Sequence, residues 1–120
     1  MNISGNEWSV LTKLWEQSPL TLKQLCDTVG RENGWTKHGV ISTLKRMEAK
    51  GSITVEQTAE RKYFYPAVTE AQARAHETNA LANKAYGGSK LLLVSNIVTE
   101  EELSGAEIDE LMTILKKRKG

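Results

Sequence analysis

The sequence is poor in the residues from which disulfide frameworks and metal centres are built. Of its 120 residues only one is a cysteine, Cys26, and only two are histidines, His38 and His76. A single cysteine cannot form an internal disulfide, and these three side chains are too few for a metal site with nitrogen and sulfur ligands. We therefore expect no disulfide, no metal and no cofactor.

Long hydrophobic runs are also lacking. No stretch approaches the roughly 20 apolar residues that a membrane-spanning helix needs, and residues 1–8 lack the basic and then apolar pattern of a signal peptide. The sequence therefore predicts a soluble, cytoplasmic protein with no membrane partner.

Motifs typical of enzymes are scarce. The chain has no glycine-rich phosphate loop, no nucleophile elbow and no clustered set of acids and bases. The three consecutive glutamates at 100–102 precede a predicted helix start, where the helix dipole favours negative charge. We therefore expect no catalytic residues and a binding protein instead of an enzyme.

Charge of one sign is not in excess over the whole chain, because the net charge is only +1. Residues 36–62 nevertheless hold six Lys and Arg side chains against three Glu side chains, a local excess of three positive charges. Any electrostatic attraction to nucleic acid must therefore come from the distribution of charge and not from its total.

Two helices are predicted near the N-terminus from their capping residues and hydrophobic spacing. The first begins at a capping box formed by Ser4 and Glu7. The second is capped by Thr21, carries Cys26 on its apolar stripe and ends at Gly30. The position of Cys26 on this stripe indicates a core residue and not a reactive thiol.

The third predicted helix, bounded by Thr36 and Gly51, has two distinct faces. Its apolar stripe consists of Val40, Leu44 and Met47, which recur at helical spacing and are expected to face the core. At 100° per residue, the opposite side is mostly polar. The candidate binding residues on this side and its flanks are Thr36, Lys37, His38, Ile41, Ser42, Lys45 and Arg46.

Two short strands follow, at 53–55 and 63–65, in segments of β-branched and aromatic residues. The polar turn between them carries Arg61 and Lys62. Three helices and a basic hairpin, in this order, are typical of a winged helix-turn-helix, whose third helix enters the major groove while the hairpin reaches the phosphate backbone. We therefore predict that the exposed side of the third helix, together with Arg61 and Lys62, contacts double-stranded DNA.

The remaining residues are predicted to be helical. Residues 69–86 are rich in alanine and contain no proline or glycine, which favours a long helix. Ser89 caps a further helix, and Ser104 with Glu107 forms a capping box before the last one. The predicted fold is thus mostly α with a small β-hairpin: a winged-helix DNA-binding domain at 1–68 and a helical dimerisation domain at 69–120.

The last two helices carry more apolar side chains than two helices can bury by themselves. We therefore expect these helices to pair with a second copy of the chain in a homodimer. The residues predicted to form the dimer interface are Leu91, Leu92, Val94, Ile97, Leu111 and Leu115.

Four segments together resemble the BlaI/MecI/CopY family of penicillinase repressors. They are Ile-Ser-x-x-Glu-Trp at 3–8, the stretch 35–51 from Trp-Thr to Arg-Met-Glu-Ala-Lys-Gly, Tyr-x-Tyr at 63–65, and Leu-Ser-x-x-Glu-Ile-x-x-Leu at 103–111. The resemblance implies a winged-helix homodimer that represses β-lactam-resistance or related genes from a palindromic operator. It also implies release by a sensor-linked protease that cuts the repressor between Asn96 and Ile97.

The chain departs from the pattern of that family in several places. Ile41 and Thr43 stand where an arginine and a leucine are common, so the operator is expected to differ. Ile97 stands where phenylalanine usually follows the cleaved bond, and an equally weighted alternative is that Asn96 faces solvent while Ile97 packs in the dimer core. The paired Cys-x-Cys elements of copper-responsive members are absent, which excludes copper sensing by that route.

Two other functions remain compatible with this sequence. A winged-helix regulator of another family would bind a small-molecule effector in its dimer region. A winged helix used only for protein contacts would present its third helix to a partner protein. Binding to random duplex DNA separates DNA-binding from protein-binding modules, because phosphate neutralisation makes DNA affinity fall steeply with salt.

Overall fold

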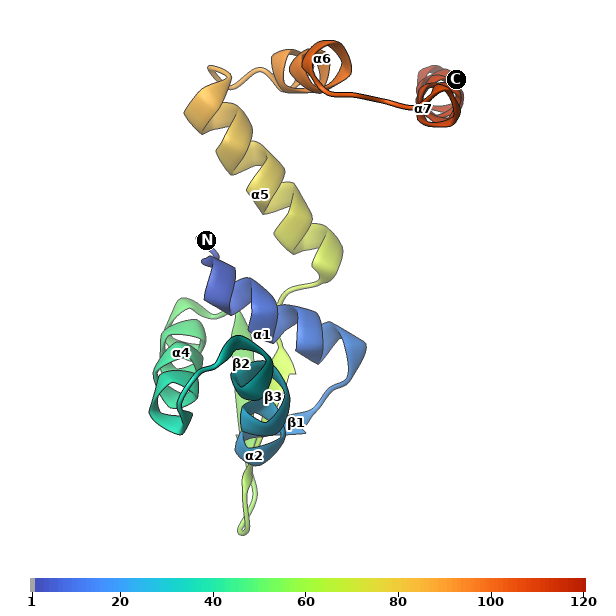
Figure 1. The fold of residues 1–120 in the computed structure, drawn as a ribbon. Helices are drawn as coiled ribbons and strands as arrows, with labels where there is room; N and C mark the ends of the chain where they lie inside the picture. Colours follow the sequence, from blue (N-terminus) through green and yellow to red (C-terminus); the bar gives the residue numbers. More distant parts are fainter. Residues whose placement is uncertain (1) are drawn as a thin grey trace. The chain divides into compact units, whose positions relative to one another are not determined.

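The N-terminal part of the chain combines helices with a small antiparallel sheet (Figure 1). The computed structural model describes residues 2–120. Its contacts divide the chain into two compact units, one ending at Thr78 and the other spanning Asn79–Gly120, whereas the sequence predicted a boundary after residue 68. The elements that lie wholly within the first unit are α1 (Gly5–Glu16), β1 (Leu20–Thr21), α2 (Leu22–Leu25), the π-helical segment η1 (Cys26–Gly30), α3 (Arg31–Asn33), α4 (Lys37–Lys50), β2 (Ile53–Gln57) and β3 (Lys62–Pro66).

The core of this unit lies between α1, α4 and the sheet. Helix α1 contributes Val10, Leu11 and Leu14, and the sheet contributes Ile53 and Phe64. The predicted inward stripe of α4 is confirmed, because its three members are each at most 3% exposed. Cys26 is half-buried and packs against this core, as its place on an apolar stripe predicted.

The second predicted helix does not stop at Gly30, and this expectation was wrong. The chain stays helical from α2 through η1 to the end of α3, and the left-handed residue that ends it is Gly34, with φ of 70°. Gly30 has helical angles, and a Cβ placed on it would lie only 3.0 Å from Cγ2 of Val40. Gly30, which the sequence predicted to end the helix, instead allows α4 to pack closely against it.

The sheet has three strands, one more than the predicted hairpin. Strands β2 and β3 pair antiparallel, with Val55 opposite Phe64, and β1 pairs antiparallel with the other edge of β3 through Leu20 opposite Phe64. Strand β1 has only two residues and directly precedes the Thr21 cap of α2, so it lacks the length from which alternation can be recognised. The β2–β3 turn projects beyond the helices as a narrow wing (Figure 1).

The rest of the chain is helical, as predicted. It contains α5 (Glu70–Ala85), α6 (Lys90–Glu100) and α7 (Gly105–Lys119). Ser89 caps α6, and Ser104 and Glu107 form the expected capping box of α7, which lowers the pKa of the Glu107 carboxyl through hydrogen bonds from Ser104. Within residues 2–120, no helix has the combination of length and hydropathy that crossing a membrane requires.

Candidate DNA interface

An ion pair between the buried carboxylate of Glu7 and the exposed ammonium of Lys50 fixes α4 against α1. Nζ of Lys50 lies 3.0 Å from both carboxylate oxygens of Glu7, and the hydroxyl of Ser4 donates to the same carboxylate at 2.8 Å. Burial by itself raises the pKa of Glu7, but the hydrogen bonds from Ser4 and Lys50 and the charge of Lys50 outweigh this effect and lower it. Ser4 therefore caps α1 as predicted, and the Glu7 carboxylate of the same motif also binds Lys50.

The start of α4 is set by a tight turn after α3. The backbone N–H of Trp35 donates to the carbonyl of Gly30 at 2.7 Å, and Trp35 itself packs against the core. The hydroxyl of Thr36 then accepts from the N–H of Gly39 at 3.0 Å, which confirms the predicted cap. This turn presents Lys37 and His38 to solvent in the first turn of α4.

The predicted outer face of α4 is exposed or half-buried throughout. Lys37, His38, Lys45 and Arg46 are exposed, and Ser42 is half-buried. The guanidinium of Arg46 lies 3.4 Å from the hydroxyl of Thr43, which in turn donates to the carbonyl of Gly39. The structure therefore leaves these candidate residues of α4 accessible to solvent, and their contact with DNA stays a prediction.

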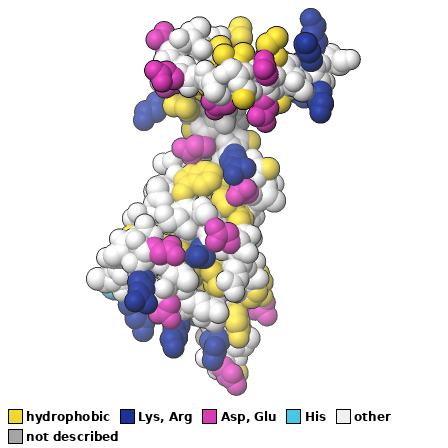
Figure 2. All heavy atoms as spheres, turned by 45° about the vertical axis from the view of Figure 1, so that its right-hand side comes forward, with side chains coloured by type: hydrophobic (Ala, Val, Ile, Leu, Met, Phe, Trp, Pro, Cys, Tyr) yellow, Lys and Arg dark blue, Asp and Glu magenta, His cyan; other side chains and the backbone are white. Residues whose placement is uncertain are grey.

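The tip of the wing is organised by Thr58. Its N–H and its hydroxyl both donate to the carbonyl of Arg61, at 2.9 and 3.0 Å, and its hydroxyl accepts from the N–H of Arg61 at 3.2 Å. Arg61 and Lys62 are exposed beside this turn, and so is Glu60. Figure 2 accordingly shows Lys and Arg side chains, with some acidic ones among them, on the lower part of the N-terminal unit.

Along the wing, the hydroxyl of Tyr65 donates to the carboxylate of Glu56 at 3.1 Å. Desolvation and this hydrogen bond raise the pKa of Tyr65, so its hydroxyl stays protonated as a donor. Glu56, one of the acidic side chains of the wing, is thus hydrogen-bonded to the neighbouring strand.

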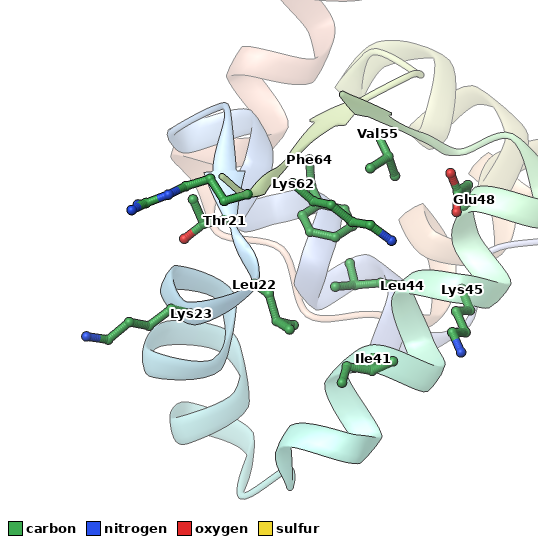
Figure 3. A pocket seen from close by; sticks show the side chains of 11 residues that line it. Thr21, Leu22, Lys23, Ile41, Leu44, Lys45, Glu48, Val55, Lys62 and Phe64 are labelled. Atoms are coloured by element: carbon green, nitrogen blue, oxygen red, sulfur yellow. The ribbon is translucent and has the colours of Figure 1, made fainter. Parts of the chain in front are cut away.

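A hollow of about 580 Å³ separates α4 from α2 and the sheet (Figure 3). Leu22, Ile41, Leu44 and Phe64 point toward one another across it. The sequence placed Ile41 at the flank of the inward stripe, and the structure shows that it faces this hollow. Lys23 also borders the hollow. It was not predicted, because its only signal in the sequence is a basic residue in the first turn after the Thr21 cap.

The second unit presents apolar side chains on its surface. Only Ala82 and Leu93 are buried among the hydrophobic residues described from Asn79 onward. In contrast, Leu91 is 76% exposed and Leu115 is 63% exposed. The other four predicted interface residues are also exposed: Leu92, Val94, Ile97 and Leu111.

The predicted cleavage position lies within a regular helix. Asn96 and Ile97 are both exposed and belong to α6. The side-chain oxygen of Asn96 accepts a hydrogen bond from the hydroxyl of Tyr86 at 2.9 Å. Asn96 therefore lies at the surface of α6, the bond after it is held in helical geometry, and cleavage of this bond stays a prediction.

Comparison with known proteins decides the family. Residues 3–117 match the family model of the penicillinase repressors. The chain belongs to the penicillinase repressor family. This result confirms the resemblance deduced from the four sequence segments, and the match extends over both units.

Two penicillinase repressor relatives are similar along nearly their whole length. The methicillin resistance regulatory protein MecI of Staphylococcus aureus (strain N315) is 28% identical over 116 residues, which cover 97% of this chain and 94% of that protein. The penicillinase repressor of Bacillus licheniformis is 24% identical over 117 residues, covering 98% and 91%. A solved MarR/EmrR family transcriptional regulator from Acinetobacter sp. ADP1 has 26% identity and a TM-score of 0.47, with 98% of this chain and 74% of that chain covered.

The family and these relatives are repressors, in agreement with the expectation that this chain is not an enzyme. Among residues 2–120, no three side chains of His, Cys, Asp or Glu come together as ligands of a metal ion. The winged helix-turn-helix predicted from the order of the elements is confirmed, with a third strand added to its hairpin.

Proposed function

We propose that this penicillinase repressor acts as a homodimer on a palindromic operator of β-lactam-resistance-type or related genes, and that proteolysis releases it. The observation that carries the proposal is the division of α4 into two faces. One face is buried against the core, whereas the other carries Lys37, His38, Lys45 and Arg46 in solvent. A recognition helix requires this division, because its base-reading side chains must project while the fold holds the helix in place.

The contacts are assigned by position along α4 and the wing. His38, Ser42 and Lys45 lie on the side opposite the buried stripe and Lys37 lies on its flank. All four are proposed to meet base edges in the major groove. Arg46, on the flank, and Arg61 and Lys62, on the wing, are proposed to contact phosphates. Ile41 supplies an apolar edge suited to a thymine methyl group.

The homodimer is supported by the uncovered apolar side chains of α6 and α7. In α6 the apolar residues are consecutive from Leu91 to Val94 and surround most of the helix, whereas in α7 Ile108, Leu111 and Leu115 recur at helical spacing on one face. Each large apolar side chain that becomes fully buried contributes roughly 1.5–3 kcal/mol, so several of them favour association strongly. A second copy of the chain is the partner with which such a face would make a symmetric interface.

Release by proteolysis would act through this interface. A cut between Asn96 and Ile97 separates α7 from the winged helix and removes half of the apolar residues named for the dimer contact, Ile97, Leu111 and Leu115. Because two linked half-sites raise the apparent affinity of a dimeric repressor, loss of the dimer would release it from DNA. The bond lies in a helix, so α6 must open locally before a protease can bind it as an extended segment.

The experiment begins with selection of bound DNA from a random duplex pool by the full-length protein. The selected site is then used in anisotropy titrations over a range of salt concentrations. A DNA-binding repressor gives a steep fall of affinity with salt, and loss of one phosphate contact reduces the slope by about one. A module that only binds proteins would show no such slope and no enriched sequence, which would contradict the proposal.

Matched charge removals locate the interface. Lys45→Ala and Arg46→Ala are expected to weaken binding without changing the urea midpoint, since both side chains are exposed. Lys84→Ala is the control, because it removes the same charge from an exposed position of α5 outside the proposed contacts. Equal affinity of all three variants and the wild type would show that α4 does not read this DNA.

A further inference from the structure

The hollow between α2, α4 and the sheet is an apolar recess beside the proposed DNA contacts of α4 and the wing. We propose that it binds an amphiphilic organic anion, a carboxylate with an apolar tail or ring, and that its occupation opposes DNA binding. The opposition to DNA binding rests on the proposed function. The binding of the anion to the hollow does not depend on it.

The floor of the hollow is apolar and partly open. Leu44 and Phe64 are nearly buried, whereas Leu22, Ile41 and Val55 are half-buried and still present surface to solvent. Figure 3 shows these side chains converging from α2, α4 and the two wing strands. With about 580 Å³, the hollow has the size of ordinary small-molecule sites, which span roughly 300–1,000 Å³.

The rim of the hollow is positively charged. Four cationic side chains border it, and Glu48 is the one acidic side chain among its lining residues. Within residues 2–120, none of the four has a carboxylate partner within 4.0 Å. These rim residues are Lys23, Lys45, Arg61 and Lys62. Apolar walls with uncompensated cations at the edge are complementary to a ligand that has an apolar body and an anionic end.

Duplex DNA fits the rim but not the floor. Its phosphates can pair with exposed lysines, but the polar sugar–phosphate backbone offers little that would cover Leu22, Val55 and Phe64. An amphiphilic anion would bury these side chains and at the same time occupy rim cations that the DNA contact needs. Because Lys45, Arg61 and Lys62 belong to both sites, binding of the two ligands is expected to be mutually exclusive.

Decanoate is a suitable probe, used below its micelle-forming concentration with the full-length, isotope-labelled protein. We expect saturable amide shifts in two-dimensional NMR that cluster at Leu22, Ile41, Leu44, Val55 and Phe64. Decanol lacks the charge and decylammonium has the opposite charge, so both should bind at least tenfold more weakly. Absence of shifts at these residues, or equal binding of all three probes, would overturn the proposal.

Three variants separate the hollow from the apolar surface of the second unit. Leu22→Asn places a polar group in the wall, and Lys23→Ala removes a rim charge at an exposed position; each should weaken decanoate binding at least threefold. Leu92→Asn is the control, since Leu92 is an exposed leucine of α6. If Leu92→Asn abolishes binding and the other two variants leave it unchanged, decanoate binds the second unit and the proposal is wrong.

The effect on DNA is measured separately. For a mutually exclusive ligand, decanoate at ten times its own dissociation constant should raise the dissociation constant for DNA about tenfold. Unchanged DNA affinity, with the hollow shown to be filled by NMR, would refute the opposition between the ligands. Failure of the protein to bind any DNA would instead contradict the proposed repressor function, whereas the NMR titration still decides whether the hollow binds the anion.

Discussion

Apolar helix residues are buried in the N-terminal unit of this repressor and exposed in the second unit. In α4, apolar residues at helical spacing are covered by α1 and the sheet. In α7 the same spacing produces side chains that remain uncovered, with Leu115 63% exposed, and the apolar run of α6 is likewise mostly exposed. Periodicity therefore identifies which side of a helix is apolar, but it does not say whether the chain itself or another molecule covers that side.

The largest expected contrast comes from one substitution placed in each unit. Leu44→Asp puts an unpaired charge into the core of the N-terminal unit and should cost more than about 4 kcal/mol, enough to unfold it. Leu92→Asp should leave that unit folded, because Leu92 is 57% exposed. Urea unfolding followed by circular dichroism measures both effects.

A second experiment tests whether another copy of the chain covers the apolar side chains of the second unit. The double variant Leu92→Asp with Leu111→Asp should sediment as a monomer, retain the circular dichroism of a folded N-terminal unit and lose most of its affinity for a two-half-site DNA. A wild-type chain that sediments as a monomer at micromolar concentration would refute the proposed dimer.

Truncation after Asn96 tests the role of the exposed apolar side chains by removing some of them instead of substituting them. The shortened chain loses α7 and the end of α6 but keeps every core residue of the N-terminal unit. We expect a folded monomer whose affinity for a palindromic site falls about 100-fold or more, because linkage of two half-sites is lost. Sedimentation and anisotropy check this outcome. A truncated chain that stays dimeric and binds normally would make cleavage at this bond an ineffective switch.

Much of the fold followed from capping residues and spacing. Thr36, Ser89 and Ser104 each begin a helix where predicted, because a side-chain oxygen at that position accepts from a free backbone N–H. The errors came from residues whose role depends on distant parts of the chain. Gly30 resembles a helix stop, but Val40 determines its role, and Glu7 completes a capping motif in sequence while Lys50 binds its carboxylate in space.

The candidate site shows the same limit. The exposed face of α4 could be predicted because it is defined within a single helix. The hollow could not, since Leu22, Ile41 and Phe64 come from three elements whose packing no local pattern encodes. Strand β1 was missed for a related reason: two residues become a strand only because β3 offers its edge.

A pair of charge variants tests how firmly α4 is held to α1. Lys50→Met leaves the buried Glu7 carboxylate without its ammonium partner and should lower stability by about 1–3 kcal/mol. Glu16→Gln, at an exposed carboxylate 3.6 Å from Lys13, should change stability by less than about 0.5 kcal/mol. Urea midpoints of both variants at neutral pH measure the difference.

The same pair has a defined pH dependence. The pKa of Glu7 is lowered in the folded protein, so its contribution to stability is fully present above its unfolded value of about 4.3 and is lost as the pH falls through the lower folded value. The stability difference between the wild type and Glu7→Gln should therefore shrink below about pH 4.3. A difference that stays constant down to pH 3 would show that the Lys50 contact does not depend on ionisation of Glu7.

The smallest expected effects come from two glycines that share a helical conformation but differ in their surroundings. A Cβ on Gly30 would lie 3.0 Å from the buried Val40, so Gly30→Ala should destabilise the protein despite the better helix propensity of alanine. A Cβ on Gly39 would lie 3.4 Å from Oγ1 of Thr36, an ordinary contact, so Gly39→Ala should raise stability by up to about 1 kcal/mol.

Gly39 lies on the same flank of α4 as Arg46, the proposed phosphate contact, so a methyl group there should weaken DNA binding roughly three- to tenfold by holding the DNA backbone away. Urea unfolding and anisotropy on the same samples measure the two effects. Higher stability with unchanged DNA affinity would mean that Gly39 is only a poor helix former, and that the DNA backbone does not approach α4 along this flank.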